Sequence, residues 1–124
     1  MIDFNNKPIL NFKSVSIKEG ELAVDAILID GEEIIACFAA MREKVVFTNK
    51  RIITLTKVGL TGNKTDYTTL PYSGIQAFSI ETHGDFDSDA DIELVLSGLG
   101  TIRFELKEGS NIQYLCKIIA KHIL

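Results

Sequence analysis

The chain has 124 residues and a mass of 13.7 kDa, which fits one domain. Hydrophobic residues make up 46% of it and charged residues 24%, values typical of a globular protein that exclude a disordered one. The formal net charge of −4 opposes non-specific binding to nucleic acid or to an anionic membrane, because both need clustered lysine and arginine. We therefore expect no nucleic-acid partner, and the charge disfavours a membrane lipid partner.

Targeting signals and cysteine usage indicate the compartment. The sequence has no run of about 18 apolar residues that would predict a membrane-spanning helix. Near the N-terminus, the short apolar pair Ile9-Leu10 is too little for a signal peptide. Cys37 lies in an apolar run and Cys116 in a helical pattern, which favours two buried thiols in a reducing compartment over the alternative of a disulfide. We expect a soluble cytoplasmic protein.

The first thirty residues predict a tail and one short helix. Residues 1–15 are mixed and aperiodic, which is typical of a tail. Ser16 and Glu19 have the spacing of a capping box, so we expect a helix over 17–29 that stops before Gly31. Gly20, near the start of this helix, weakens it.

From Glu33 onward the pattern changes to that of strands. Residues 34–41 are apolar at nearly every position, as in a strand buried on both faces. Turn signals then separate four more strands, and Pro71 ends one of them because proline cannot donate to a strand ladder. These four are expected over 44–48, 51–58, 65–70 and 75–83.

The last hairpin has the clearest pattern. Large apolar residues alternate with other residues on both of its strands, and Gly98-Leu99-Gly100 supplies the turn. A slip of one residue would expose the whole apolar set, so the register is strongly determined. The set consists of Ile92, Leu94, Leu96, Ile102, Phe104 and Leu106.

A final amphipathic helix follows the hairpin. Ser110 and Gln113 again have capping-box spacing, and an apolar stripe runs along the rest of the segment. That stripe must cover something apolar, for which the open end of a curled sheet is the natural candidate. The stripe consists of Ile112, Leu115, Cys116, Ile119 and Ile123.

Several segments, taken in order, resemble the bacterial pleckstrin-homology-like domains. They are Phe47-Thr48-Asn49-Lys50-Arg51-Ile52-Ile53, Gly59-Leu60-Thr61-Gly62, Leu70-Pro71-Tyr72 and Phe78-Ser79-Ile80-Glu81-Thr82. The resemblance is to a small single-domain bacterial group of unknown function. It implies a mainly β (α+β) fold in which a bent antiparallel sheet of seven strands forms an open barrel capped by a C-terminal helix.

The resemblance carries further implications. It runs from about Glu32 to the C-terminus, which divides the chain into a tail with a short helix over 1–31 and a pleckstrin-homology-like domain over 32–124. It implies no catalytic residues and no cofactor. It also implies homo-oligomers, often ring-like.

Two patterns suggest a cation site and are weak. The acidic loop Asp85–Asp91 begins like a calcium loop, but its sixth position is Ala90 and its twelfth is Leu96. His83, near Asp85 and Asp87, could be a base or a metal ligand, but the sequence offers no third partner. We expect a solvated acidic turn and no metal site.

Five residues remain as candidate contacts for a ligand or partner. Lys44, Lys50 and Arg51, near Lys57, form the main basic grouping, for which ordinary edge-strand charges are the simpler interpretation. Tyr67 and Tyr72 flank a proline turn and could line a peptide groove, or could be half-buried sheet aromatics. The preferred hypothesis is a non-catalytic interaction domain that associates with itself through sheet edges and helix faces. The alternative is a peptide- or lipid-binding module acting near the membrane.

Overall fold

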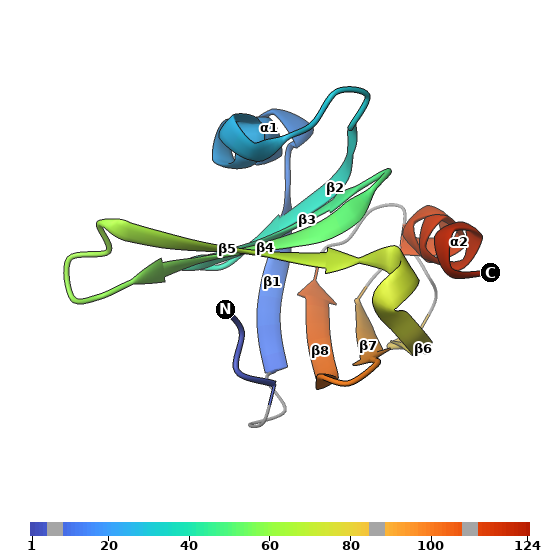
Figure 1. Ribbon diagram of the computed structural model, residues 1–124. Helices are drawn as coiled ribbons and strands as arrows, with labels where there is room; N and C mark the ends of the chain where they lie inside the picture. Colours follow the sequence, from blue (N-terminus) through green and yellow to red (C-terminus); the bar gives the residue numbers. More distant parts are fainter. Residues whose placement is uncertain (5–8, 85–88, 108–111) are drawn as a thin grey trace.

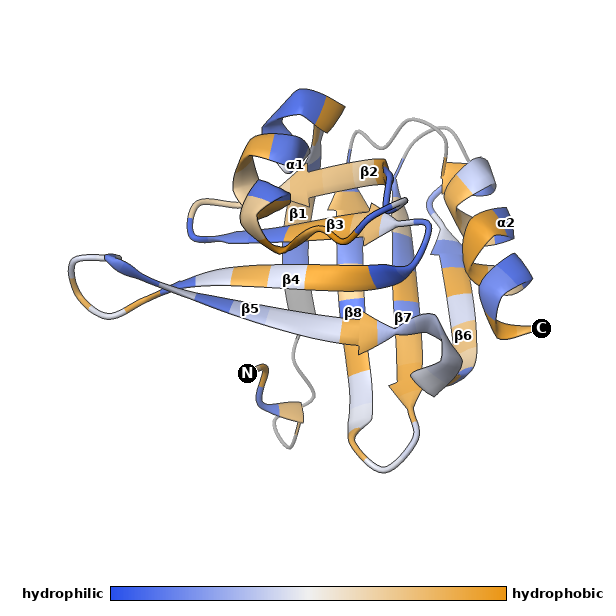
Figure 2. Cartoon of the chain, turned by 45° about the horizontal axis from the view of Figure 1, so that its top comes forward, coloured by the Kyte–Doolittle hydropathy of each residue, from blue (hydrophilic) through white to orange (hydrophobic). Residues whose placement is uncertain are grey.

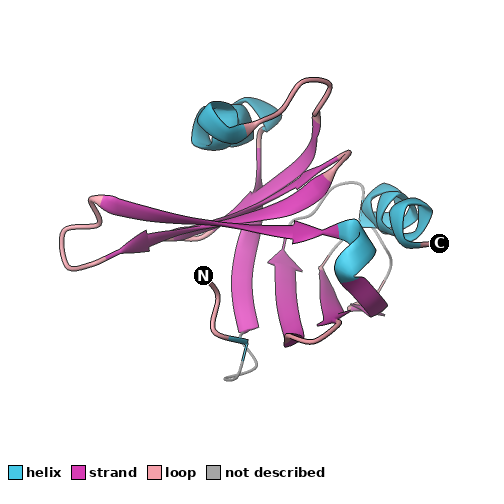
Figure 3. Ribbon diagram, viewed as in Figure 1, coloured by secondary structure: helices cyan, strands magenta, loops and turns pink. Residues whose placement is uncertain are grey.

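The structure, a computed structural model, describes residues 1–4, 9–84, 89–107 and 112–124 and is mainly β (Figure 3). Eight strands form one sheet in the order β5-β4-β3-β2-β1-β8-β7-β6. The strands are β1 (Ile9–Val15), β2 (Ile34–Ala39), β3 (Glu43–Thr48), β4 (Arg51–Val58), β5 (Lys64–Pro71), β6 (Ile75–Thr82), β7 (Ala90–Leu96) and β8 (Gly100–Lys107). The helices are α1 (Ile17–Val24) and α2 (Ile112–Ile123), with short 3₁₀ turns η2 (Asp25–Ile27) and η3 (Tyr72–Gly74).

Strand β1 is the main departure from the sequence prediction, which was wrong to treat residues 1–15 as a tail. β1 lies in the middle of the sheet, antiparallel to β2 and parallel to β8. It raises the number of strands from the expected seven to eight. Its pairing with β8, Leu10 opposite Phe104 for example, joins positions about ninety residues apart, so no local pattern reveals it.

The sheet bends so that its two halves face each other across the core. Strands β2 to β5 form one half, strands β1, β8, β7 and β6 the other, and α2 lies beside the open side (Figure 1). The predicted strands and the last hairpin are confirmed, with ends that differ by a few residues. Bands of alternating hydropathy are visible along β7 and β8 (Figure 2).

The core is aromatic at its centre and aliphatic around it. Phe104 lies 6.1 Å, centroid to centroid, from both Phe12 and Phe47, so it joins the two halves of the sheet. All six alternating residues of the last hairpin are buried, as the period predicted. The stripe of α2 also faces this core, with Ile112, Leu115 and Ile119 at most 1% exposed.

Helix α1 covers the opposite face of the first half of the sheet. The capping prediction is confirmed, since the Ser16 hydroxyl accepts a hydrogen bond from the Glu19 N–H at 3.1 Å. The helix ends at Val24, earlier than expected, and continues only as η2. Val24 packs with Cys37 and Ile53 in a second apolar cluster, whereas Phe38 faces the main core. The prediction that 34–41 is buried on both faces therefore holds at Cys37 and Phe38, but the other residues of β2 are half-buried and Met41, beyond its end, is exposed.

Both cysteines are buried and unpaired, in agreement with the sequence prediction of free thiols. Burial raises the pKa of Cys37 and of Cys116 to about 11, so both thiols are protonated and unreactive near neutral pH. Among the described residues, no helix is long and apolar enough to cross a membrane.

Candidate functional site

The three basic candidates, Lys44, Lys50 and Arg51, do not gather into one pocket. Lys50 is exposed in the turn between β3 and β4, whereas Lys44 is half-buried near the start of β3. The length of the strand separates the two lysines, about 15 Å of extended chain. Arg51 begins β4 under the same turn as Lys50, and its guanidinium is engaged within the protein.

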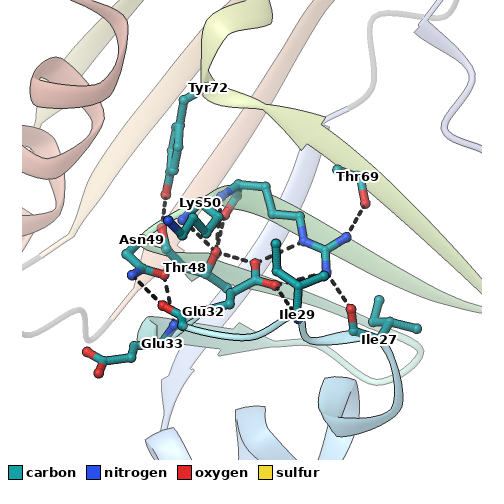
Figure 4. Close-up of polar contacts among 11 residues, drawn as sticks. Ile27, Ile29, Glu32, Glu33, Thr48, Asn49, Lys50, Thr69 and Tyr72 are labelled. Atoms are coloured by element: carbon teal, nitrogen blue, oxygen red, sulfur yellow. Dashed lines mark hydrogen bonds and ion pairs between the residues drawn. The ribbon is translucent and has the colours of Figure 1, made fainter.

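A buried carboxylate, Glu32, engages that guanidinium (Figure 4). Its Oε2 accepts hydrogen bonds from Arg51 Nε at 2.9 Å and from the Thr48 hydroxyl at 2.6 Å. Its Oε1 accepts from Arg51 Nη2 at 3.0 Å and from the backbone N–H of Ile29 at 3.1 Å. Four donors therefore satisfy a side chain that is 0% exposed.

Two further donors of Arg51 also bind protein atoms. Nη1 donates to the Thr69 hydroxyl at 2.9 Å, and Nη2 donates to the Ile27 carbonyl at 2.5 Å. Arg51 thus connects β4 to β5 and to the segment after α1. These contacts hold the segments around the β3–β4 turn together. They also leave Arg51 poorly placed to bind a ligand.

Electrostatics support the same interpretation. Burial by itself would raise the pKa of Glu32, but the hydrogen bonds from Arg51, Thr48 and Ile29 outweigh it and hold the pKa below its ordinary value. Glu32 is therefore ionised near neutral pH. A buried ion pair with all its hydrogen bonds made fixes geometry, because any displacement leaves an uncompensated charge.

The two candidate tyrosines have separate roles. Tyr72 is 3% exposed, and its hydroxyl donates to the Thr48 carbonyl at 2.6 Å. Its ring stacks on His122 of α2 at a centroid distance of 4.7 Å, and burial raises its pKa. Tyr67 lies in β5 opposite Leu55 and is 44% exposed. Of the pair, Tyr67 is the residue whose side chain reaches solvent.

A second polar cluster lies on the outer face of β6, β7 and β8. We call the side chains of Glu81, Asp91, Glu93 and Glu105, grouped around Arg103, the acidic face. Arg103 lies 2.8 Å from Asp91, 3.3 Å from Glu81, 3.5 Å from Glu93 and 3.7 Å from Glu105, measured between nitrogen and oxygen atoms. Four carboxylates around one guanidinium leave this face with a net charge of −3.

His83 adjoins the acidic face and completes a possible ligand group. Its Nε2 lies 3.0 Å from Asp91 Oδ2. One ligand atom from each of Glu81, His83 and Asp91 lies within 4.8 Å of the others, a spacing that a metal ion could bridge. Arg103, however, already places a positive charge against two of these three side chains. Asp85 and Asp87, which the sequence paired with His83, lie outside the described residues.

A third surface is the hairpin of β4 and β5, which projects from the rest of the sheet (Figures 1 and 2). Leu60 at its tip is fully exposed, and Val58 is 42% exposed. Lys57 and Lys64 flank the tip, which contains no acidic residue between them. We call residues 57–64 the arm.

Sequence reasoning missed the two residues that organise these clusters. Glu32 is one of two adjacent acids before an apolar run, and nothing local distinguishes it from Glu33. The role of Arg103 was easier to predict, because the register of the last hairpin places it opposite Glu93 and between Thr101 and Glu105 on the same face. The positions of Glu81 and Asp91 around it follow only from the pairing of β6 with β7.

A bent, mainly antiparallel sheet with a C-terminal helix beside its open side is a pleckstrin-homology-like fold. Solved structures of two bacterial proteins share it. One is a DUF1696 family protein with a pleckstrin-homology domain from Shewanella loihica, at a TM-score of 0.74 and 36% identity over 93% of this chain and 99% of that one. The other is a pleckstrin homology domain from Shewanella amazonensis, at a TM-score of 0.61 and 37% identity over 89% and 90%.

The sequence profile of the family described as Bacterial PH domain matches residues 3–123, and the chain belongs to this family. An uncharacterised Bacillus subtilis protein, YjqA, is 38% identical over 76% of this chain and 77% of its own length. The resemblance proposed from the sequence is thereby confirmed. The descriptions of the family and of these relatives indicate no catalytic activity.

Proposed function

We propose that this protein is a non-catalytic interaction domain of the cytoplasm that associates with copies of itself. The observation that carries the proposal is the open sheet. Within the described residues, β5 pairs only with β4, and β6 pairs only with β7. Each edge therefore offers unpaired backbone donors and acceptors, which other strands can use.

The surroundings of the two edges strengthen the proposal. β5 is one strand of the hairpin that carries the arm, and β6 is one border of the acidic face. The two edges therefore differ in shape and charge. Contacts between two different surfaces of identical chains join head to tail, and such contacts generate closed rings or open filaments.

Light scattering coupled to size-exclusion chromatography tests the proposal on the full chain. We expect a mass that is a multiple of the 13.7 kDa monomer at micromolar concentration. Hydrogen exchange at the same concentration should protect the backbone amides of β5 or β6 relative to a dilute sample. A mass of 13.7 kDa that stays constant up to about 100 µM, a concentration well above a micromolar Kd, contradicts self-association.

One observation favours a second candidate, a peptide-binding module. Helix α2 packs against η3 and β6, so the free edge of β6 runs beside a helix. An extended peptide could add a strand there. Peptides selected from a displayed library should protect the amides of β6 from exchange, and protection confined to other elements contradicts this candidate. Its lipid form has less support, because Arg51 is engaged by Glu32.

A further inference from the structure

The arm is a built feature with an exposed apolar tip. Arg42 Nη2 donates to the Gly59 carbonyl at 2.6 Å, and the Gly62 N–H donates to the same carbonyl at 3.3 Å. The Lys57 N–H donates to the Arg42 carbonyl at 2.8 Å, which fixes the base of the arm. These bonds hold the Leu60 side chain fully exposed to solvent. In an isolated chain this side chain contributes no free energy of apolar burial.

The charge around the arm is positive in a chain that is negative overall. Arg42, Lys57 and Lys64 contribute +3, and the neighbouring Glu43 and Lys44 cancel each other. Asp66, further along β5, already pairs with the terminal amine of Met1. The arm therefore attracts an acidic surface. Because the chain has a net charge of −4, another copy can provide such a surface.

The acidic face has the opposite charge and a small apolar neighbour. Its four carboxylates exceed its single guanidinium by three charges, and the side chains of Glu81 and Glu93 are 69% and 41% exposed. Ala77 pairs with Val95 two positions along the same strands, so both lie on the same outer face as Glu93. Ala77 is exposed and Val95 is half-buried, which provides an apolar contact beside the charges.

We propose that the arm of one copy docks on the acidic face of the next copy. Lys57, Lys64 and Arg42 then face Glu81 and Glu93, and the tip leucine packs on the apolar patch of Ala77 and Val95. The arm that binds an acidic face must come from a second copy of the chain, because each arm projects away from β6, β7 and β8 of its own chain (Figure 1). This inference rests on the proposed self-association and names the two surfaces that meet.

Mixing two variants gives the sharpest test. The arm variant carries Lys57→Glu and Leu60→Asp, and the face variant carries Glu81→Lys and Glu93→Lys. Each variant alone should have the monomer mass of 13.7 kDa, because one of its two surfaces is reversed. An equimolar mixture should form a dimer, through the intact face of one variant and the intact arm of the other.

Matched controls separate this effect from a general effect of charge. Lys18→Glu and Glu21→Lys reverse exposed charges on α1, which belongs to neither surface, and should keep the wild-type mass. Circular dichroism and thermal unfolding of all variants verify that they remain folded. High salt should reduce assembly of the wild type, because it screens the attraction between exposed charges.

Each outcome decides between two failures. A wild-type protein that stays monomeric overturns the proposed function and this inference together. A wild type that assembles while both variants also assemble overturns only the pairing of arm and acidic face. The same holds if both variants are monomeric but fail to combine. If, in addition, the wild type pellets with anionic phosphatidylserine vesicles and the arm variant does not, the arm is assigned to a membrane.

A cross-linking experiment provides an independent readout. Leu60→Cys and Ala77→Cys, introduced into separate chains, should form a mixed disulfide in a mixture of the two under mild oxidation. The native thiols do not interfere, because both are buried and have a pKa of about 11. Matched chains with Leu60→Cys and Lys18→Cys should cross-link at least tenfold more slowly, and equal rates contradict the proposed contact.

Discussion

Glu32 and Arg51 meet through two parallel contacts, Nε to Oε2 at 2.9 Å and Nη2 to Oε1 at 3.0 Å. The pair joins the segment before β2 to the first residue of β4, which are 19 positions apart in the sequence. Tyr72 reaches the same turn from the opposite side through its bond to the Thr48 carbonyl. The β3–β4 turn is therefore fixed from two sides, which positions the hairpin that carries the arm.

We expect Glu32→Ala to destabilise the protein by about 3 kcal/mol, the lower end of the range for removing one partner of a buried ion pair. The lower end applies because Arg51 is 17% exposed and keeps its contacts to Thr69 and Ile27. Urea unfolding followed by circular dichroism measures the change. Glu33→Ala, at an exposed neighbouring position, serves as the control and should change the free energy by less than about 0.5 kcal/mol. Equal effects of the two substitutions contradict a structural role for Glu32.

The lowered pKa of Glu32 predicts how stability depends on pH. Since the folded-state pKa lies below the ordinary value of 4.5, the pair contributes stability that is fully present above pH 4.5. That contribution is lost as the pH falls below 4.5 and through the folded-state pKa. Unfolding free energies measured from pH 7 to pH 3 should therefore fall less steeply at the acid end for Glu32→Gln than for wild type. Glu33→Gln should retain the wild-type slope, and identical slopes for all three proteins contradict the assignment.

We expect Gly20→Ala to destabilise the protein although alanine favours helices. A Cβ at this position would lie 3.0 Å from Cys37 Cβ and 3.3 Å from its Sγ, so helix α1 would have to move away from β2. Overpacking of this kind costs about 1–3 kcal/mol, against a gain of about 1 kcal/mol in helix propensity. Urea unfolding measures the net effect. Lys18→Ala, on an exposed position of the same helix, is the matched control, and a Gly20→Ala protein more stable than wild type contradicts the close packing.

Elements with a local signature were predictable from the sequence. The strands β7 and β8 alternate with period two, α2 has an apolar stripe with helical period, and Ser16 has its capping partner three positions later. In each case neighbouring residues carry the information. Gly20 shows the limit of this reasoning, since it reads as a weak point of the helix and in the structure marks the close approach of α1 to Cys37.

Elements whose order depends on distant pairing were not predictable. β1 is specified by pairing with β8 and β2, and residues 9–15 have no clean alternation of their own. The candidate site shows the same division. The hairpin register relates Glu93 to Arg103, but only the fold brings Glu81 to them and assigns Arg51 to Glu32. A basic residue that the sequence suggests as a ligand contact, such as Arg51, can instead be paired with a buried carboxylate.

The position of Phe104 between the two halves of the sheet predicts a large loss on truncation. Phe104→Ala should destabilise the protein by about 3–5 kcal/mol, because it removes a fully buried ring and leaves a cavity beside Phe12 and Phe47. Thr101→Ala, on the outer face of the same strand, should cost less than about 1 kcal/mol. Thermal and urea unfolding measure both. A Phe104→Ala protein as stable as wild type contradicts a core shared by the two halves.

His83 reports directly on the acidic face. Its hydrogen bond to Asp91, together with the negative charge of that carboxylate, raises the pKa of His83 above the ordinary value of 6.5. The contact therefore stabilises the fold below pH 6.5 and loses its effect as the pH rises through the higher folded-state pKa. An NMR titration of the imidazole signals should give a pKa above 6.5 in wild type and a lower one in Asp91→Asn. Glu33→Gln, remote from this face, should leave the titration curve of His83 unchanged. An unchanged curve in Asp91→Asn means that the 3.0 Å contact does not persist in solution.

Arg103 shares the Asp91 carboxylate with His83. Arg103→Gln should therefore move the pKa of His83 further upward in the same titration, because the carboxylate then has one cation fewer to compensate.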